Sequence, residues 1–233
     1  MIIGNGMLAK GFTALYQDDD NVVIFASGVS DSQTTSVESY QREESLLKEI
    51  LHSLDNKLLV YFSTCSIDEP NAETMYTKHK LKLEQLIADK AQSYYIFRLS
   101  QVAGKSNKHG FFIHYLMYHI SKGIEFNVWK NTNRNVIDIE DVVKIVSYMI
   151  DKSYMMNSVI NIASPYNLKV LEYVKEIESR LDIEANYILV DKGSPFEIEI
   201  DIVHSLVDSI GVDFLTQKKY LSNLIEKYYK DIQ

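Results

Sequence analysis

Short apolar runs, rich in β-branched and aromatic residues, alternate along this chain with stretches of helical apolar spacing. The runs predict seven strands, at residues 1–3, 22–26, 58–62, 94–97, 126–129, 159–162 and 187–190. The spacing between them predicts helices with apolar stripes near residues 46–54, 81–87, 142–150, 168–181 and 221–229. Because the runs are apolar throughout rather than alternating, they are typical of strands buried on both faces of a parallel sheet. The pattern therefore predicts an α/β fold, with helices on both sides of that sheet.

Composition and charge narrow the function classes. The chain has 233 residues, and its formal net charge is -8. This acidic balance argues against nucleic acid or an anionic membrane as the main partner, since both reward clusters of Lys and Arg. A single cysteine, Cys65, excludes an internal disulfide framework and is typical of a reducing compartment. No apolar run is long enough to span a bilayer and the first residues lack a signal-peptide pattern, so we expect a cytoplasmic protein.

The chain opens with MIIGNGMLAKGF, in which two glycines follow directly on the first predicted strand. Gly4 allows a tight turn, Gly6 lets the backbone approach a pyrophosphate, and Ala9 lets the first helix pack closely on the strand. The N-terminal end of that helix offers positive partial charge to an anion. A turn without a ligand is the alternative interpretation. As a cofactor loop, the stretch predicts contacts from Gly4, Asn5, Gly6, Met7 and Leu8, on a strand that is central and paired on both sides.

A second candidate site follows the third predicted strand, which ends in the hydroxyl-rich turn STCS at residues 63–66. The next helix carries Tyr76 and Lys80, which are four residues apart and so lie on one face. An ammonium near a phenol lowers the pKa of the phenol toward a value useful for proton transfer. An ordinary surface helix is the alternative, since the chain has 16 tyrosines.

The chain resembles the extended short-chain dehydrogenase/reductases, because three motifs follow one another in that family's order: the glycine turn, the hydroxyls at a strand end and Tyr-x-x-x-Lys. That family contains nucleotide-sugar epimerases, dehydratases and ketoreductases. YYIFRLSQVAG resembles its Arg-Leu-x-Asn-Val-x-Gly pattern, with Gln101 where Asn is usual. NRNVIDIEDVVKIV resembles its Arg-x-x-Ile-x-Val-x-Asp-Val segment and places Arg134 and Asp141. VINIASPYNLKVLEYVKEI resembles the strand and helix that follow, so the resemblance runs nearly end to end.

The resemblance implies a Rossmann-like doubly wound parallel sheet that binds NAD(P)H, with a smaller substrate-binding lobe. The dinucleotide-binding lobe would comprise residues 1–104 plus about 131–164. The substrate-binding lobe would comprise about 105–130 plus 165–233, and the two would form one compact structural unit.

The resemblance also implies roles for single residues. Thr64 would orient the sugar carbonyl or hydroxyl, with Ser63 and Ser66 as alternatives. Tyr76 would pass the proton, and Lys80 would hold the nicotinamide ribose and tune Tyr76. The residues implied in substrate binding are Ser66, Gln101 and Arg134, the last two at the diphosphate.

The chain is nevertheless short for this family. Between the glycine turn and the hydroxyl-bearing strand only one strand is predicted, where the family has three. Its ending, Ala26-Ser27-Gly28, resembles the family's fourth strand, which passes beneath the cofactor. We therefore expect the second and third strands to be missing, and Ala26, Ser27 and Gly28 to contact the cofactor. The acidic residue that binds the adenosine ribose usually stands at the end of a strand, whereas Asp31 lies in the polar stretch 27–41, which is predicted to be a loop. The choice between NAD and NADP therefore stays open.

The implied activity is reduction of a 4-keto-6-deoxy nucleotide sugar in surface-polysaccharide sugar biosynthesis. A loosely held cofactor suits a reductase, which exchanges it at every turnover, more than an epimerase, which retains it. A C4 epimerase or epimerase-reductase is the alternative within the family, and a non-catalytic dinucleotide sensor or scaffold is the alternative from another class. The family often dimerises through helices that correspond to about residues 43–54 and 73–88, so we expect a homodimer.

Several remaining residues receive plainer interpretations. Cys65 is expected to be a buried, inert thiol. His79 is expected to face solvent, away from the face of Tyr76. His109, His114 and His119 recur at five-residue spacing, which does not stack on one helix face, so we expect no metal site.

Overall fold

The computed structural model describes residues 1–70, 72–105, 111–214 and 216–229. It divides into two compact units, Met1–Ser100 with Ile139–Ile162, and Gln101–Asp138 with Ala163–Gln233. Residues 131–138 therefore lie in the second unit, whereas the sequence pattern grouped them with the dinucleotide-binding lobe.

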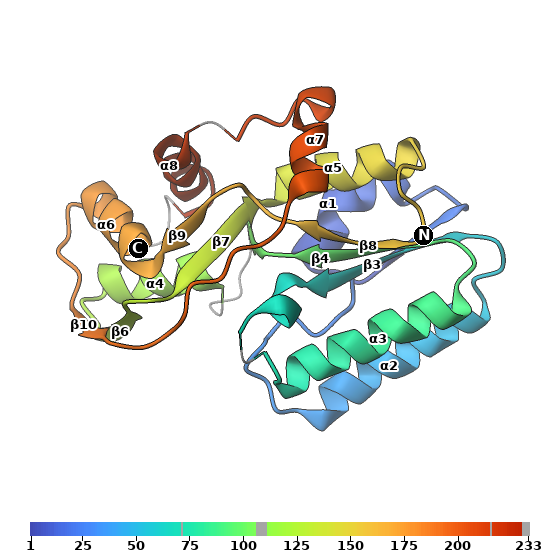
Figure 1. Cartoon of the computed structure of the whole chain (residues 1–233), viewed down its shortest axis with the longest axis horizontal. Coiled ribbons are helices and arrows are strands. Elements are labelled where there is room, and N and C mark those ends of the chain that lie inside the picture. The colour runs from blue at the N-terminus through green and yellow to red at the C-terminus, as the bar shows by residue number, and fades with distance from the viewer. Residues whose placement is uncertain (71, 106–110, 215, 230–233) are drawn as a thin grey trace. The chain divides into compact units, whose positions relative to one another are not determined.

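A five-stranded parallel sheet forms the centre of the first unit, in the order β1-β2-β3-β4-β8 (Figure 1). The strands are β1 (Ile2–Ile3), β2 (Val22–Phe25), β3 (Leu58–Thr64), β4 (Tyr94–Leu99) and β8 (Ser158–Ile162). The middle strands β2, β3 and β4 are buried almost throughout, as a parallel sheet covered on both faces requires. This confirms the predicted fold class.

Helices cover both faces of this sheet (Figure 1). On one face are α1 (Met7–Tyr16) and α5 (Ile139–Asp151), and on the other α2 (Val37–His52) and α3 (Met75–Lys90). On the α1 face, the buried Phe12 ring stacks on Phe62 with centroids 5.4 Å apart. On the α2–α3 face, the predicted stripes close the core through Leu47, Leu83 and Ile87. Both stripes therefore pack onto the sheet.

The pairing of β2 decides how the sheet has been shortened. β2 lies between β1 and β3 and is parallel to both, with Ile24 opposite Ile2 and Val60. This is the position of the family's fourth strand, so the expected loss of two strands agrees with the observed order. The prediction that the first strand is central was wrong, because among the described residues β1 pairs with β2 alone and lies at the sheet's edge. The pairing of β1 with β2 is extended by the Ile24 N–H, which donates to the Met1 carbonyl at 2.9 Å, and by the Ala26 N–H, which donates to the Ile3 carbonyl at 2.8 Å.

The polar stretch at residues 27–41 is shorter as a loop than its composition predicted. Helix α2 begins at Val37, and the Ser36 hydroxyl caps it by accepting from the Ser39 N–H at 3.1 Å. A serine at this position satisfies one of the free N–H groups of the first turn. The first turn of α2 therefore starts within a sequence that reads as polar coil.

In its described residues, the second unit contains two small sheets and four helices. One sheet has the order β5-β7-β9 and the other pairs β6 with β10 in parallel. The strands are β5 (Gln101–Ala103), β6 (Phe126–Trp129), β7 (Asn133–Asp138), β9 (Asn167–Lys169) and β10 (Tyr187–Val190). The helices are α4 (Phe112–Ser121), α6 (Val170–Leu181), α7 (Asp201–Ile210) and α8 (Gln217–Tyr229). Within this unit Asp138 holds α8 by accepting from Lys227 Nζ at 2.8 Å and from the Tyr228 hydroxyl at 2.5 Å.

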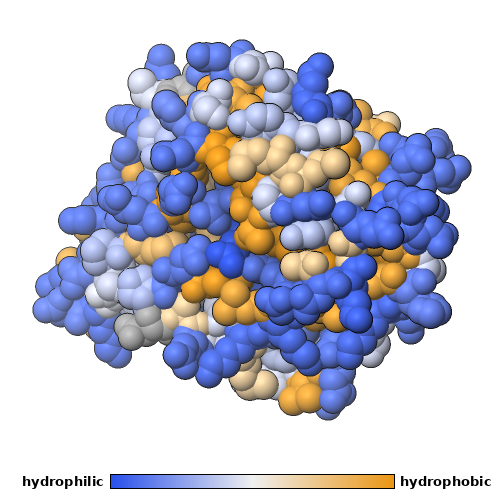
Figure 2. Space-filling view, turned by 45° about the vertical axis from the view of Figure 1, so that its right-hand side comes forward, coloured by the Kyte–Doolittle hydropathy of each residue, from blue (hydrophilic) through white to orange (hydrophobic). Residues whose placement is uncertain are grey.

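Hydrophilic residues predominate on the face drawn in Figure 2, with hydrophobic residues exposed between them. Among the described residues, no helix has both the length and the apolar character needed to cross a membrane.

The two glycines of the opening turn give a matched test of the fold. Gly4 has φ +125°, and a Cβ there would lie 2.4 Å from the Ala26 carbonyl oxygen, whereas a Cβ on Gly6 would meet nothing within 4 Å. We expect Gly4→Ala to lower the free energy of unfolding by at least about 2 kcal/mol, through strain and the clash with β2. Gly6→Ala should cost no more than about 1 kcal/mol, since it only weakens a helix cap. Urea denaturation followed by circular dichroism measures both, and equal stabilities would contradict the turn geometry.

Candidate active site

The turn between β1 and α1 presents open backbone at a helix start. Gly6 is the N-cap of α1, and no side chain caps it. The first N–H groups of a helix have no partner within it, and the first turn of α1 holds no acidic residue that would compete with an anion. Asn5, Met7 and Leu8 complete this turn, and the buried Ala9 seats the helix on the sheet. The space beside Gly6 is therefore free for a phosphate.

The end of β2 lies directly beside this turn. The tight approach of Gly4 to Ala26 and Ser27 brings the two segments into contact. Arg42, from α2, donates to the Ser27 hydroxyl at 3.2 Å and to the Ser27 carbonyl at 3.1 Å. These contacts fix the segment that the sequence placed beneath a cofactor.

The adenosine half of a bound dinucleotide would contact fewer protein groups than the pyrophosphate would. β1 is the edge of the sheet among the described residues, so no further strand extends beyond the glycine turn. Asp31 is exposed in the loop after β2, where its carboxylate accepts from the Gln33 N–H at 2.9 Å. The turn thus fits a pyrophosphate, but the usual wall and acidic residue for the adenosine ribose are lacking in the described part of the chain.

Tyr76 lies at the start of α3, where Thr74 and Thr77 form a reciprocal cap. The Tyr76 side chain is buried, and burial raises the pKa of its phenol to about 12, while a hydrogen bond with Thr64 acts in the opposite direction. The charge of Glu43 raises this pKa further. The lowering of this pKa by Lys80 that the sequence predicted is therefore not found, because burial dominates and the phenol is protonated at neutral pH.

The three hydroxyls at the end of β3 have different partners. Ser63 donates to Glu84 Oε1 at 2.5 Å, and Ser66 donates to Glu69 Oε1 at 3.0 Å. Thr64 accepts from the Ser66 N–H at 3.1 Å and is also the hydroxyl paired with Tyr76. The geometry therefore brings Thr64, rather than the two serines, to the phenol.

Lys80 follows Tyr76 by one turn and is 2% exposed. Its Nζ lies 5.8 Å from the centroid of the Tyr76 ring, and it donates to Glu43 Oε1 at 2.7 Å and to the Tyr61 hydroxyl at 3.1 Å. These contacts use two of its three N–H donors. Burial lowers the pKa of Lys80, and the Glu43 charge counteracts this effect.

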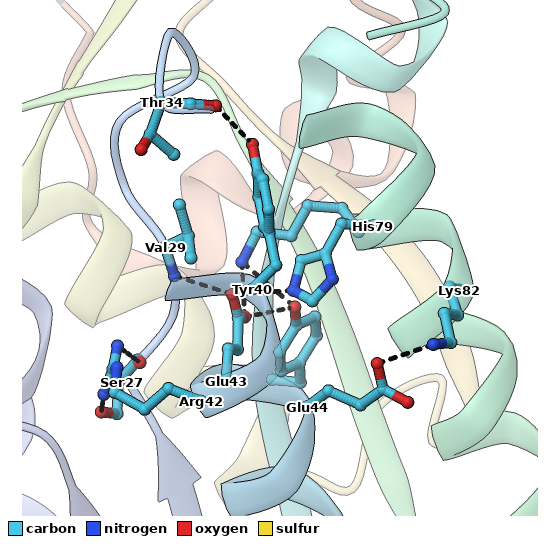
Figure 3. Close-up of polar contacts among 11 residues, drawn as sticks. Ser27, Val29, Thr34, Tyr40, Arg42, Glu43, Glu44, His79 and Lys82 are labelled. Atoms are coloured by element: carbon cyan, nitrogen blue, oxygen red, sulfur yellow. Dashed lines mark hydrogen bonds and ion pairs between the residues drawn. The ribbon is translucent and has the colours of Figure 1, made fainter. Parts of the chain in front are cut away.

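Glu43, on α2, was missed by the sequence analysis (Figure 3). It is fully buried, and its carboxylate also accepts from the Tyr61 hydroxyl at 2.8 Å and the Val29 N–H at 2.7 Å. Burial by itself would raise the pKa of Glu43, but the His79 hydrogen bond and the Lys80 charge outweigh it and hold that pKa at about 2. The signal was present in the sequence, because Glu43 shares helical spacing with Tyr40 and Leu47, both buried.

His79 is the clearest correction among the individual residues. It was expected to face solvent, but it is buried, with Nε2 3.2 Å from Glu43 Oε2 and its ring 4.8 Å from that of Tyr40. A carboxylate can only accept, so Nε2 is the protonated nitrogen. Cys65 is buried as expected, donates to the Arg98 carbonyl at 3.1 Å, and has a pKa that burial raises to about 12.

The remaining candidates belong to the second unit. Gln101 begins β5 and is exposed, while Arg134 lies in the neighbouring strand β7 and donates to the Asn133 carbonyl at 3.2 Å. His109 lies outside the described residues. Within the ranges that the structure does describe, no group of three or more His, Cys, Asp and Glu side chains is arranged to hold a metal ion.

Solved structures with the same fold act on nucleotide sugars or bind nicotinamide dinucleotides. RMD from Pseudomonas aeruginosa, complexed with NADPH, is 16% identical with a TM-score of 0.70, covering 94% of this chain and 84% of that chain. A dTDP-glucose 4,6-dehydratase from Bacillus anthracis in complex with NAD is 14% identical with a TM-score of 0.71, covering 98% and 78%. A UDP-glucuronic acid 4-epimerase from Bacillus cereus is 16% identical with a TM-score of 0.72, covering 96% and 79%. At these identities the likeness shows the fold.

The sequence itself places the chain in a family. No curated protein sequence matches it. The profile of the NAD dependent epimerase/dehydratase family matches residues 13–163, which is more than half of the chain. The match spans Thr64, Tyr76 and Lys80 together with strands β2, β3, β4 and β8, whereas β1 and the glycine turn precede it. The chain therefore belongs to the NAD dependent epimerase/dehydratase family of enzymes.

Proposed function

We propose that this enzyme is an NAD(P)-dependent reductase that acts on the carbonyl of a 4-keto-6-deoxy nucleotide sugar. The observation that carries the proposal is the buried Tyr76 phenol, which is protonated at neutral pH and hydrogen-bonded to Thr64, with Lys80 one turn away. The structural neighbours named for nucleotide sugars, and the NADPH complex among them, support the substrate and cofactor class. In this role the enzyme would work in the cytoplasm on sugars for surface polysaccharides.

Each residue then has a defined task in the reduction. The nicotinamide, when bound, supplies a hydride to the carbonyl carbon. Tyr76 donates its proton to the carbonyl oxygen, so that the C=O bond becomes an alcohol, and Thr64 orients that oxygen by a hydrogen bond. Lys80 holds the nicotinamide ribose with its remaining donor. In the substrate lobe, Gln101 and Arg134 bind the diphosphate, for which the Arg fork of donors is suited.

The sheet edge favours a reductase over an epimerase. Without further strands beyond β1 in the described residues, the adenosine half of the cofactor is bordered by few protein groups. A reductase must release its oxidised cofactor after each turnover, and a shallow adenosine site helps that release.

The catalytic tyrosine gives the sharpest test of the activity. Tyr76→Phe removes the proton donor while leaving the packing nearly intact, so kcat should fall by about 10²–10⁴-fold with cofactor affinity retained. Tyr94→Phe, at the opposite end of β4 from the site, is the matched control and should keep full activity. Oxidation of NADH and NADPH with a panel of 4-keto nucleotide sugars measures both. Near-normal turnover of Tyr76→Phe on a competent substrate would favour the sensor or scaffold.

The phosphate turn gives a second test. Gly6→Val places a branched side chain in space that is empty of protein atoms, so the chain should fold normally. The same side chain would fill the position of the pyrophosphate. We expect calorimetry to show at least a tenfold loss of NADH and NADPH affinity with an unchanged circular dichroism spectrum. Unchanged affinity would show that the dinucleotide binds elsewhere.

We also propose a C2 homodimer formed through α2 and α3. The stripes of both helices pack on the sheet, but Met75 and Leu81 leave apolar side chains exposed on α3, at 51% and 45%. Leu81→Glu should therefore convert the dimer to a monomer, because a charge would be buried at the interface. Leu15→Glu, on the exposed side of α1, is the matched control and should stay dimeric. Light scattering at micromolar concentration measures the mass of each protein in solution. A monomeric mass for the wild-type chain would refute the proposed interface.

A further inference from the structure

The Glu43 carboxylate accepts four hydrogen bonds, two on each oxygen. Oε1 receives Lys80 Nζ and the Tyr61 hydroxyl, and Oε2 receives the Val29 N–H and lies 3.2 Å from His79 Nε2. The donors come from β3, from α3 and from the loop after β2. Figure 3 shows Glu43 turned from α2 toward His79 and Val29, while its neighbour Glu44 points toward Lys82. These four hydrogen bonds therefore hold the Glu43 carboxylate in one position.

Lys80 depends on this carboxylate for its charge. An ammonium that is 2% exposed pays a large desolvation cost and loses its proton unless a counter-charge lies close by. Glu43 Oε1, at 2.7 Å, is that counter-charge, and Tyr61 links the two by donating to Glu43 and accepting from Lys80. Glu84 also acts on Lys80, as a more distant negative charge from its own helix.

Gly28 makes room for this pair. A Cβ at residue 28 would lie 2.8 Å from both Glu43 Oε1 and Lys80 Nζ. Gly28 has an ordinary negative φ, so the backbone conformation does not require glycine there. The lack of a side chain is instead needed for the two charged groups to meet beneath the end of β2.

We propose that Glu43 is a positioning residue of the active site: its buried carboxylate keeps Lys80 charged and aims it at the cofactor ribose and at Tyr76. This inference rests on the proposed function, because it takes Lys80 as the residue that serves the cofactor and the phenol. Glu43 itself touches neither. It acts through Lys80, whose Nζ it holds one helical turn from Tyr76.

The other groups around the site do not replace Glu43. Tyr76 is faced by Thr64 from β3, by Tyr40 from α2, and by the more distant charge of Asp31 in the loop. Lys80 is faced by Tyr61, Glu84 and the Tyr76 ring besides Glu43. Glu84 is already bonded by Ser63 and by Arg98 Nε at 3.0 Å, so it is committed to another charge. Loss of Glu43 therefore leaves Lys80 without a carboxylate in contact.

The test follows the Lys80 ammonium directly, by NMR titration of protein labelled at the lysine Cε and Nζ, with Lys80→Arg to assign the signal. In Glu43→Gln, the midpoint of the Lys80 titration should fall by about one to three pH units, because burial is then opposed only by the more distant Glu84 charge. Affinity for NADH or NADPH, measured by calorimetry, should fall as pH rises through the new midpoint. In the wild-type protein the same fall in affinity should occur at a higher pH than in Glu43→Gln.

Glu44→Gln is the matched control. Glu44 is the adjacent residue and is also ion-paired, with Lys48 at 2.7 Å and Lys82 at 2.6 Å, but those partners are exposed. Removal of the Glu44 charge should leave the midpoint of the Lys80 titration unchanged. A merely structural role for Glu43 would lower stability without moving the Lys80 titration, so an unmoved midpoint in folded Glu43→Gln overturns the proposal.

A second variant and a comparison with enzymatic activity complete the test. If Glu43→Gln fails to fold, Glu43→Asp retains the charge but withdraws it by one methylene, and a smaller fall in the midpoint is expected, with no fall refuting the role. The titration needs no turnover. A shifted midpoint in a protein without reductase activity therefore refutes only the proposed function, and an unshifted midpoint in an active reductase refutes only the role of Glu43.

Discussion

A carboxylate and an ammonium, both buried and bonded to each other, tie two helices of the first unit to its sheet. Glu43 belongs to α2 and Lys80 to α3, and Tyr61 attaches the pair to the middle of the sheet. Leaving either charge alone in the interior would cost far more than the pair gains over an apolar contact. The two helices and the loop after β2 are therefore held to one arrangement, and Tyr76 takes its place from the helix so fixed.

The shortened sheet changes the geometry of the cofactor site. In a doubly wound sheet the ligand lies where the strand order reverses, with strands on both sides of the crevice. Here the order β1-β2-β3-β4-β8 runs in one direction, so the glycine turn lies at an edge. The edge strand has only two residues, which limits the unpaired backbone that another chain could add to. The glycine turn is present, while in the part of the chain that the structure describes no strand lies beyond it.

The sequence predicted the main strands because these are continuous apolar runs, such as residues 22–25 and 58–62. It predicted the shortening because the family that the chain resembles has three strands where only one such run is present. It missed β5, β7 and β9 because these are short or carry polar residues, as in the NRN of β7. It misplaced His79 because helical spacing was read from apolar residues alone. Polar residues at core positions, such as Glu43, are invisible to that reading until their partners are known. The roles of Thr64, Tyr76 and Lys80 stay predictions, although the structure brings the three side chains to one end of the sheet.

The open space at residue 28 has an evolutionary consequence. Residue 28 is glycine because a side chain there would collide with Glu43 and Lys80, and not because its backbone angles require glycine. We therefore expect substitutions of this glycine to be tolerated only where one of those two side chains is also replaced. Relatives that replace Glu43 by a shorter or neutral residue should therefore tolerate alanine or serine at position 28, whereas relatives that keep the pair should not. We therefore expect positions 28, 43 and 80 to change together rather than one at a time, because each occupies space or supplies charge that the other two depend on.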